Sequence, residues 1–170
     1  MISLERQKAR FPMKRSHAVA IAVSLGALAI IGTQIAWQAR QAPTYIEIDA
    51  GVIAMGKDLY SQRCASCHGI KLEGQPNWMQ RKPDGKLPAP PHDATGHTWH
   101  HSDADLFKIV KNGVQAFAGK DYKTDMPSFE ATLSDDQIKA TIAFIKSTWP
   151  EKQRNFQEQI SKNAQGTMGN

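Results

Sequence analysis

The stretch RCASCHGIKLEG, residues 63–74, decides how this chain is interpreted. It places two cysteines three positions apart, Cys64 and Cys67, and the second is followed at once by His68. They are the only two cysteines among 170 residues, and a disulfide between them would close a very small loop and add little stability. The spacing therefore points to a bound group rather than to a structural cross-link.

Four interpretations of this motif compete. A thioredoxin-like redox pair needs a βαβ context, whereas helix-like sequence precedes the motif. A structural zinc site needs four ligands, usually with a second cysteine pair; nitrogens could come from His92, His97, His100 and His101, but no second cysteine pair exists. A chance grouping is the third. The fourth is C-x-x-C-H as the attachment signature of haem c: two thiols one helical turn apart reach the vinyl groups on one porphyrin edge, and His68 projects toward the iron. We predict one covalent haem c, with its iron, on Cys64, Cys67 and His68.

The second axial position of the iron needs its own ligand. The candidates are Met55, Met79, Met126 and the other histidines. Met126 lies in the apolar stretch DMPSF, residues 125–129, about sixty residues after His68 and before the last predicted helix. Pro127 restricts the backbone just after it. We predict Met126 as the ligand, with Met79 as its main competitor and Met55 committed to packing on the first helix.

The N-terminal region carries the positive charge and a long apolar run. Residues 1–42 hold six basic side chains and one acidic one, whereas residues 43–150 hold 12 basic and 13 acidic ones, within a net charge of +5. The near-neutral remainder argues against nucleic-acid binding. Residues 17–37, HAVAIAVSLGALAIIGTQIAW, contain no Asp, Glu, Lys or Arg. A helix of that length matches a hydrocarbon layer of ~30 Å.

We therefore predict a cytoplasmic basic N-terminus over residues 1–15 and a transmembrane anchor over residues 16–37. A cleaved signal peptide and a soluble helix are the alternatives. The positive-inside rule then places the chain after Arg40 across the membrane. In a bacterium this is a single-pass protein of the inner (cytoplasmic) membrane, with its C-terminal domain facing the periplasm.

The remaining chain predicts an all-α domain. A linker over residues 38–50 leads into a domain over residues 51–150, and a polar, flexible tail covers residues 151–170. Helices are expected over residues 51–62, from a cap at Ser102 to Gly113, and from a cap at Ser134, with Gln137 completing a capping box, to Pro150. Five prolines between residues 69 and 101 predict an irregular segment there.

GKDLYSQRCASCHG (56–69), followed by MPSF (126–129) and LSDDQIKATIAFIKSTWP (133–150), resembles class I monohaem cytochrome c of the membrane-anchored bacterial type. The resemblance covers about residues 51–150. It implies three or more helices around one haem and low-spin iron with His/Met ligation. It also implies that the first and last helices cross, with Gly56 and Tyr60 against Phe144 and Ile145. In that family a proline carbonyl accepts the Nδ1 hydrogen bond of the proximal histidine, and here Pro88 and Pro90 are both candidates.

The segment from Glu73 to Asp103 departs from the compact pattern because it is long and rich in histidine. His97, His100 and His101 could bind copper or zinc or sense pH. The preferred interpretation is a solvated loop whose Trp99 packs at the haem edge. Trp78, Arg81 and Trp99 are candidate partners of the haem propionates.

Taken together, these features predict an electron carrier rather than an enzyme, either as a free carrier or as a cytochrome subunit of an oxidoreductase complex. With both axial positions filled, no substrate reaches the iron, and the haem relays one electron at a time. The expected partners are the membrane and redox proteins, such as a respiratory complex or a dehydrogenase, with no nucleic acid and no small-molecule substrate. The alternatives are a five-coordinate haem that senses or transforms a small ligand, and metal handling by the histidine-rich loop.

Overall fold

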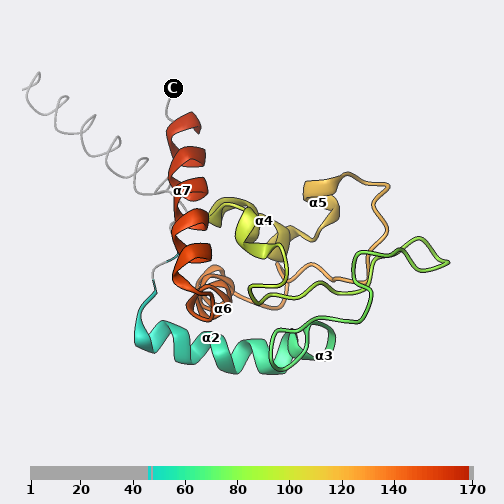
Figure 1. Cartoon of the computed structure of the whole chain (residues 1–170), viewed down its shortest axis with the longest axis horizontal. Coiled ribbons are helices and arrows are strands. Elements are labelled where there is room, and N and C mark those ends of the chain that lie inside the picture. Colours follow the sequence, from blue (N-terminus) through green and yellow to red (C-terminus); the bar gives the residue numbers. More distant parts are fainter. Residues whose placement is uncertain (1–45, 47, 169–170) are drawn as a thin grey trace, which may run out of the picture. The chain divides into compact units, whose positions relative to one another are not determined.

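The structure is a computed structural model that describes residue 46 and residues 48–168. Every regular element in that range is helical, which confirms the predicted all-α class. The longer helices are α2 (Ala50–Arg63), α4 (Asp103–Asn112), α6 (Asp135–Ser147) and α7 (Glu151–Met168). The short ones are α3 (Ala65–His68), the 3₁₀ turn η1 (Thr98–His100) and α5 (Gln115–Ala118) (Figure 1).

Helix starts follow the capping residues that the sequence offers. The Ser134 hydroxyl accepts from the Gln137 N–H, and the Gln137 side chain accepts from the Ser134 N–H, so α6 begins with a complete capping box. Ser102 caps α4, and its hydroxyl accepts from the Asp105 N–H at 3.1 Å. Asp49 caps α2. These three caps place the helix starts within a residue or two of the predicted positions.

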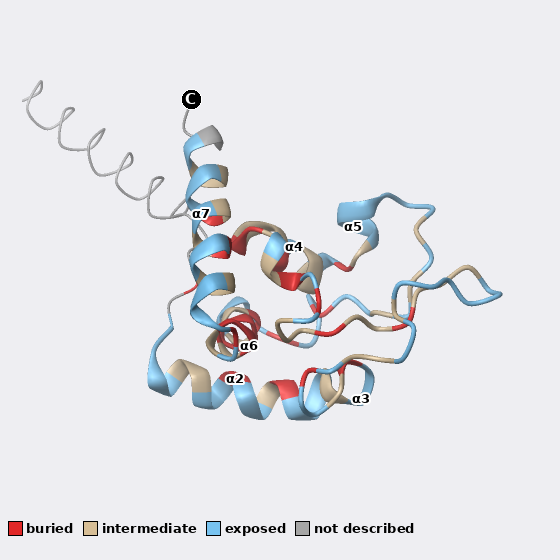
Figure 2. Ribbon diagram, in the orientation of Figure 1, coloured by how far each residue is buried: buried red, intermediate tan, exposed pale blue. Residues whose placement is uncertain are grey.

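Helices α2 and α6 cross at Gly56. A Cβ at this glycine would lie 1.9 Å from the Ala140 carbonyl oxygen and 3.0 Å from Phe144 Cβ, so only glycine lets the two backbones approach this closely. The Tyr60 ring lies 5.4 Å from the Phe144 ring, one turn farther along α2. The expected crossing is therefore present. Its buried apolar side chains form the core of the domain, and Figure 2 shows that buried positions concentrate on α6.

The expectation of a flexible tail after Pro150 is wrong for the part that the structure describes, because residues 151–168 form α7. The buried contacts of α7 are polar: Gln157 is 0% exposed and Ser161 is 2% exposed. Most side chains of residues 151–168 are polar or charged, and this is why the composition of the segment resembles a solvated tail.

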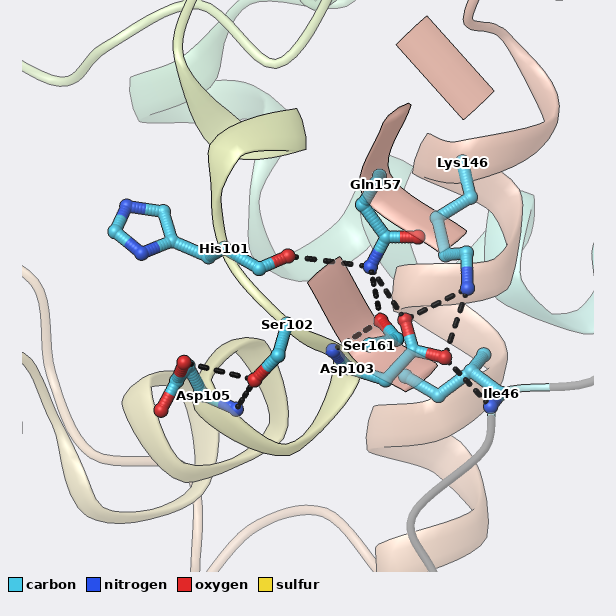
Figure 3. A network of polar contacts seen from close by, with 8 residues as sticks. All are labelled: Ile46, His101, Ser102, Asp103, Asp105, Lys146, Gln157 and Ser161. Carbon is cyan, nitrogen blue, oxygen red and sulfur yellow. Dashed lines mark hydrogen bonds and ion pairs between the residues drawn. The ribbon is translucent and has the colours of Figure 1, made fainter. Parts of the chain in front are cut away.

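Asp103, the first residue of α4, connects α7 to the rest of the domain (Figure 3). Its carboxylate lies 2.7 Å and 2.9 Å from the Lys146 ammonium on α6, and it accepts from the Gln157 Nε2 at 2.7 Å and from the Ile46 backbone N–H at 3.0 Å. Its own N–H donates to the Ser161 hydroxyl at 3.0 Å. One buried carboxylate thus joins α4, α6, α7 and the segment that precedes α2.

No helix in the described part of the chain combines the length and apolarity that crossing a membrane requires. The predicted anchor, residues 16–37, and the basic segment before it lie outside the described residues.

Candidate haem site

The three residues of the C-x-x-C-H motif lie where α2 ends and α3 begins. Cys64 terminates α2 and precedes α3, and the N–H groups of Cys67 and His68 both donate to its carbonyl, at 3.1 Å and 2.9 Å. This single turn brings all three side chains to the wall of one cavity. Cys64 is partly buried, Cys67 is exposed, and no disulfide joins them. Burial, followed by the neighbouring Cys67, raises the pKa of the Cys64 thiol to about 11.

His68 is oriented by a backbone carbonyl. The ring is buried, and its Nδ1 donates to the Pro90 carbonyl oxygen at 2.9 Å. Of the two candidate prolines, Pro90 and not Pro88 therefore supplies the carbonyl that accepts the hydrogen bond of His68. Burial lowers the pKa of the imidazole, and the Pro90 bond opposes that shift to a smaller extent. With the proton on Nδ1, the Nε2 lone pair is available to a metal ion.

Gly74 allows Pro90 to reach His68. A Cβ at this position would lie 2.4 Å from the Pro91 nitrogen and 2.7 Å from the Pro90 carbonyl carbon. The Gly74 N–H donates to the His68 carbonyl at 2.8 Å, and the next N–H donates to the Ala89 carbonyl at 2.8 Å. The two segments therefore run in contact, and this contact sets the position of the Pro90 carbonyl.

A second histidine lies against the first. The His92 ring stacks on the His68 ring, with centroids 4.0 Å apart and an interplanar angle of 23°. Its Nδ1 lies 2.8 Å from the Thr98 hydroxyl, and its carbonyl accepts from the Trp149 indole N–H at 2.7 Å. Burial, then His68 and His97, lowers the pKa of His92 well below its usual value. In the sequence, only the closeness of His92 to Pro90 distinguishes it from the other histidines of its segment.

The rest of the cavity wall is mostly apolar and comes from the irregular segment over residues 75–101, from α4, α5 and α6, and from the segment after α5. The cavity encloses about 460 Å³. Of the three candidate methionines, Met126 alone lies in this wall, where it is partly buried and packs against the core. Met79 is 75% exposed and lies outside the wall. Met55 is 41% exposed, so the expectation that it is committed to packing is wrong.

Only part of the histidine-rich segment lines the cavity. Trp78, His97 and His101 line the cavity, whereas Arg81 and Trp99 do not. Trp99 stacks on His100 at 3.7 Å and meets Phe156 of α7, so its expected place at the haem edge is not observed. Among the residues described, no group of three or more His, Cys, Asp or Glu side chains could hold a metal ion.

These donors fit a haem. A buried imidazole is presented through its Nε2, two thiols one turn apart share its cavity, a thioether lies in the same wall, and the remaining lining is apolar. Covalent attachment through thiols next to the histidine needs no further cysteine.

Comparisons with known proteins agree. The chain is 30% identical over 97 residues to the Cbb3-type cytochrome c oxidase subunit CcoP of Azospirillum sp. (strain B510), over 57% of this chain and 29% of that protein. It is 38% identical over 74 residues to the cytochrome bc1 complex cytochrome c subunit of Corynebacterium efficiens, over 42% of this chain and 25% of that protein. The chain thus spans less than a third of either relative. No solved structure matches it.

The family model for cytochrome c matches residues 53–149, which run from the first turns of α2 to the end of α6 and include the motif, the Pro90 carbonyl and Met126. The site and this match lead to one conclusion: the chain belongs to the cytochrome c family, so its cofactor is covalently bound haem c with its iron, and its chemistry is haem-based electron transfer.

Proposed function

We propose that this protein carries single electrons on a haem c that is attached to Cys64 and Cys67, with His68 and Met126 as the axial ligands of the iron. The observation that carries the proposal is the shared cavity wall. His68, already oriented by Pro90, and Met126, the only one of the three candidate methionines in the wall, line the same apolar space. The haem supplies the one-electron chemistry, and the chain supplies ligation, burial and orientation.

Two protein ligands at the iron favour electron transfer over catalysis. With both axial positions filled, no position remains for a substrate or for oxygen. A thioether ligand favours a higher reduction potential than a stronger donor does, which suits the relay of electrons between redox partners. The apolar wall limits the access of water to the iron and so keeps its surroundings similar in the two oxidation states.

The proposed setting is the periplasmic face of the inner membrane, with residues 16–37 as the anchor. The apolar run and the basic residues before it support this placement. The names of the two relatives, which denote subunits of a cbb3-type oxidase and of a bc1 complex, support a respiratory complex as the electron partner. A tether would confine the domain to the membrane surface and raise its effective concentration near such complexes.

The test of the ligation is Met126→Ala in the purified full-length holoprotein, with Met79→Ala as the matched control. We expect Met126→Ala to abolish the charge-transfer band of ferric iron bound to thioether sulfur, to lower the reduction potential, and to let carbon monoxide bind the ferrous protein. Met79→Ala should leave all three unchanged, because this side chain is 75% exposed and outside the cavity wall.

A wild-type protein that already binds carbon monoxide readily and is high-spin in the ferric state would overturn the proposal. It would favour a five-coordinate haem that senses or transforms a small ligand.

A further inference from the structure

The segment that carries Met126 is held differently on its two sides. On the N-terminal side, one side chain of α5 reaches it: the Gln115 Nε2 donates to the Tyr122 carbonyl at 3.1 Å. After Met126, the Phe129 and Glu130 N–H groups donate to carbonyls at the end of α4, at 3.2 Å and 3.0 Å. Before it, residues 119–125 form no helix. The Met126 N–H itself donates only to the neighbouring Thr124 hydroxyl, at 3.0 Å. What holds the N-terminal side of this segment therefore decides how firmly Met126 stays in the cavity wall.

A turn in the long irregular segment lies beside it. Residues 81–86, here called the 81–86 turn, are closed by two backbone hydrogen bonds: the Lys82 N–H donates to the Lys86 carbonyl at 2.9 Å, and the Gly85 N–H donates to the Lys82 carbonyl at 2.8 Å. The Asp84 carboxylate accepts from the Lys86 N–H at 2.9 Å. These bonds give the 81–86 turn a defined backbone from which its basic side chains project.

Ion pairs join this turn to the residue just before Met126. The Asp125 carboxylate pairs with the Lys86 ammonium through one oxygen, and its other oxygen lies 3.9 Å from the Lys82 ammonium. Both lysines come from the 81–86 turn, so the two attractions pull Asp125 in the same direction.

Two further contacts join the same pair of segments. The Arg81 guanidinium lies 5.4 Å from the centroid of the Tyr122 ring and is held there by a hydrogen bond of 2.6 Å from its Nη1 to the Gly85 carbonyl. The stem of Lys123 packs over Gly85, where a Cβ would lie 3.2 Å from Lys123 Cδ. The 81–86 turn thus contacts three residues among the four that precede Met126.

These contacts lie at the cavity. Lys82, Tyr122, Lys123 and Asp125 line it together with His68 and Met126. Because Asp125 and Met126 are adjacent in sequence, Met126 cannot move far from the cavity wall unless the Asp125 backbone moves with it. Motion of this segment away from the cavity would break the ion pairs with the 81–86 turn.

We propose that Lys82 and Lys86 of the 81–86 turn, through their ion pairs with Asp125, are positioning residues that hold Met126 on the haem iron and slow its replacement by an external ligand. This inference rests on the proposed ligation by His68 and Met126. It also assigns a role to part of the segment in which this chain departs from compact cytochromes c.

The strength of this restraint depends on salt. The side chains of Lys82, Lys86 and Asp125 are 42%, 33% and 56% exposed, so dissolved ions screen their attraction. The replacement of Met126 by an external ligand should therefore become faster as ionic strength rises, and this dependence should be weaker once the Asp125 charge is removed.

The experiment measures how fast imidazole replaces Met126 in the ferric full-length holoprotein, followed by the loss of the sulfur-to-iron charge-transfer band. Imidazole is largely uncharged above neutral pH, so a change in surface charge does not alter its approach. We expect Asp125→Asn to accelerate the replacement about two- to fivefold, the range expected for exposed ion pairs. The Asp125→Asn/Lys86→Met double variant should react about as fast as Asp125→Asn alone.

Asp121→Asn is the matched control, because it removes the same charge from the same segment. Asp121 is exposed and forms no ion pair with the other described residues. If Asp125→Asn reacts at the rate of this control, with the sulfur band present in both, the positioning role is wrong and the ligation stands. If the wild-type protein lacks the sulfur band, the ligation is wrong, and the positioning role is wrong with it.

Discussion

The Lys146 ammonium lies 2.7 Å from an Asp103 carboxylate oxygen, and the two side chains are only 7% and 1% exposed. Breaking a buried ion pair leaves one charge without its partner in a medium that solvates it poorly. We expect Lys146→Met or Asp103→Asn alone to lower the free energy of unfolding by about 3–5 kcal/mol. The measurement is guanidinium chloride unfolding of the holoprotein at pH 7.

The double variant Asp103→Asn/Lys146→Met removes both charges together and should be less destabilised than the sum of the two single variants, by about 1–3 kcal/mol. Strict additivity would contradict the idea of a coupled buried pair. Lys162→Met serves as a control for loss of a lysine, since its partner Glu158 and the lysine itself are exposed at 41% and 64%, and we expect it to remain close to wild type.

Gly56→Ala tests the crossing of α2 and α6. The added Cβ would meet the Ala140 carbonyl oxygen, which belongs to the backbone and cannot rotate away. Overpacking of this kind lowers stability by about 1–3 kcal/mol. Gly166→Ala on α7 is the matched control, because nothing lies within 4 Å of its Cβ, and it should be neutral or slightly stabilising. Equal melting temperatures for the two variants would show that the helices separate at little cost.

The cavity histidines predict a loss of stability in mild acid. Burial, followed by a neighbouring histidine, lowers the pKa of His97; burial also lowers that of His101, with Asp105 opposing the shift. The unfolded chain, with histidine pKa values of about 6.5, then binds more protons than the folded one, so stability is complete above that pH and falls as the pH decreases below it. Urea unfolding at pH 7.5 and 5.5 should show a smaller difference for His97→Gln/His101→Gln than for wild type.

Thioether attachment can be tested by removing the thiols. In acidified organic solvent, wild-type protein should keep its haem on the chain, whereas the Cys64→Ala/Cys67→Ala variant should release it or fail to bind it. The variant should also be less stable, because without a bound haem the mostly apolar cavity wall would be exposed to water. Haem that washes out of the wild-type protein would contradict the assignment of both cysteines.

The sequence predicted the parts of this fold that depend on local signals. Serine is a preferred N-cap residue, so the helix starts at Ser102 and Ser134 could be predicted from the adjacent residues alone. The C-x-x-C-H motif needs only one helical turn to bring its side chains together. The motif residues and Met126, all recognisable from such local patterns, line one cavity.

The other features depend on contacts between distant segments. The choice of Pro90 over Pro88 follows from the contact between Gly74 and the segment at Pro90 and Pro91, and no pattern near either proline reveals it. His92 belongs by sequence to a histidine-rich loop, although its ring stacks on His68. Helix α7 is not evident from the sequence because the residues it buries, Gln157 and Ser161, are polar and bond to an aspartate more than fifty positions away.

Helix α7 has a practical consequence for anyone who isolates the haem domain. The cytochrome c family match ends at residue 149, before α7 begins. A recombinant fragment trimmed to that boundary would lack Gln157 and Ser161, and the carboxylate of Asp103 would lose a donor while its backbone N–H lost an acceptor. Trimming at the front to residue 53 would also remove Ile46, a second donor to the carboxylate. Expression of the folded unit should therefore start upstream of Ile46 and continue through Met168.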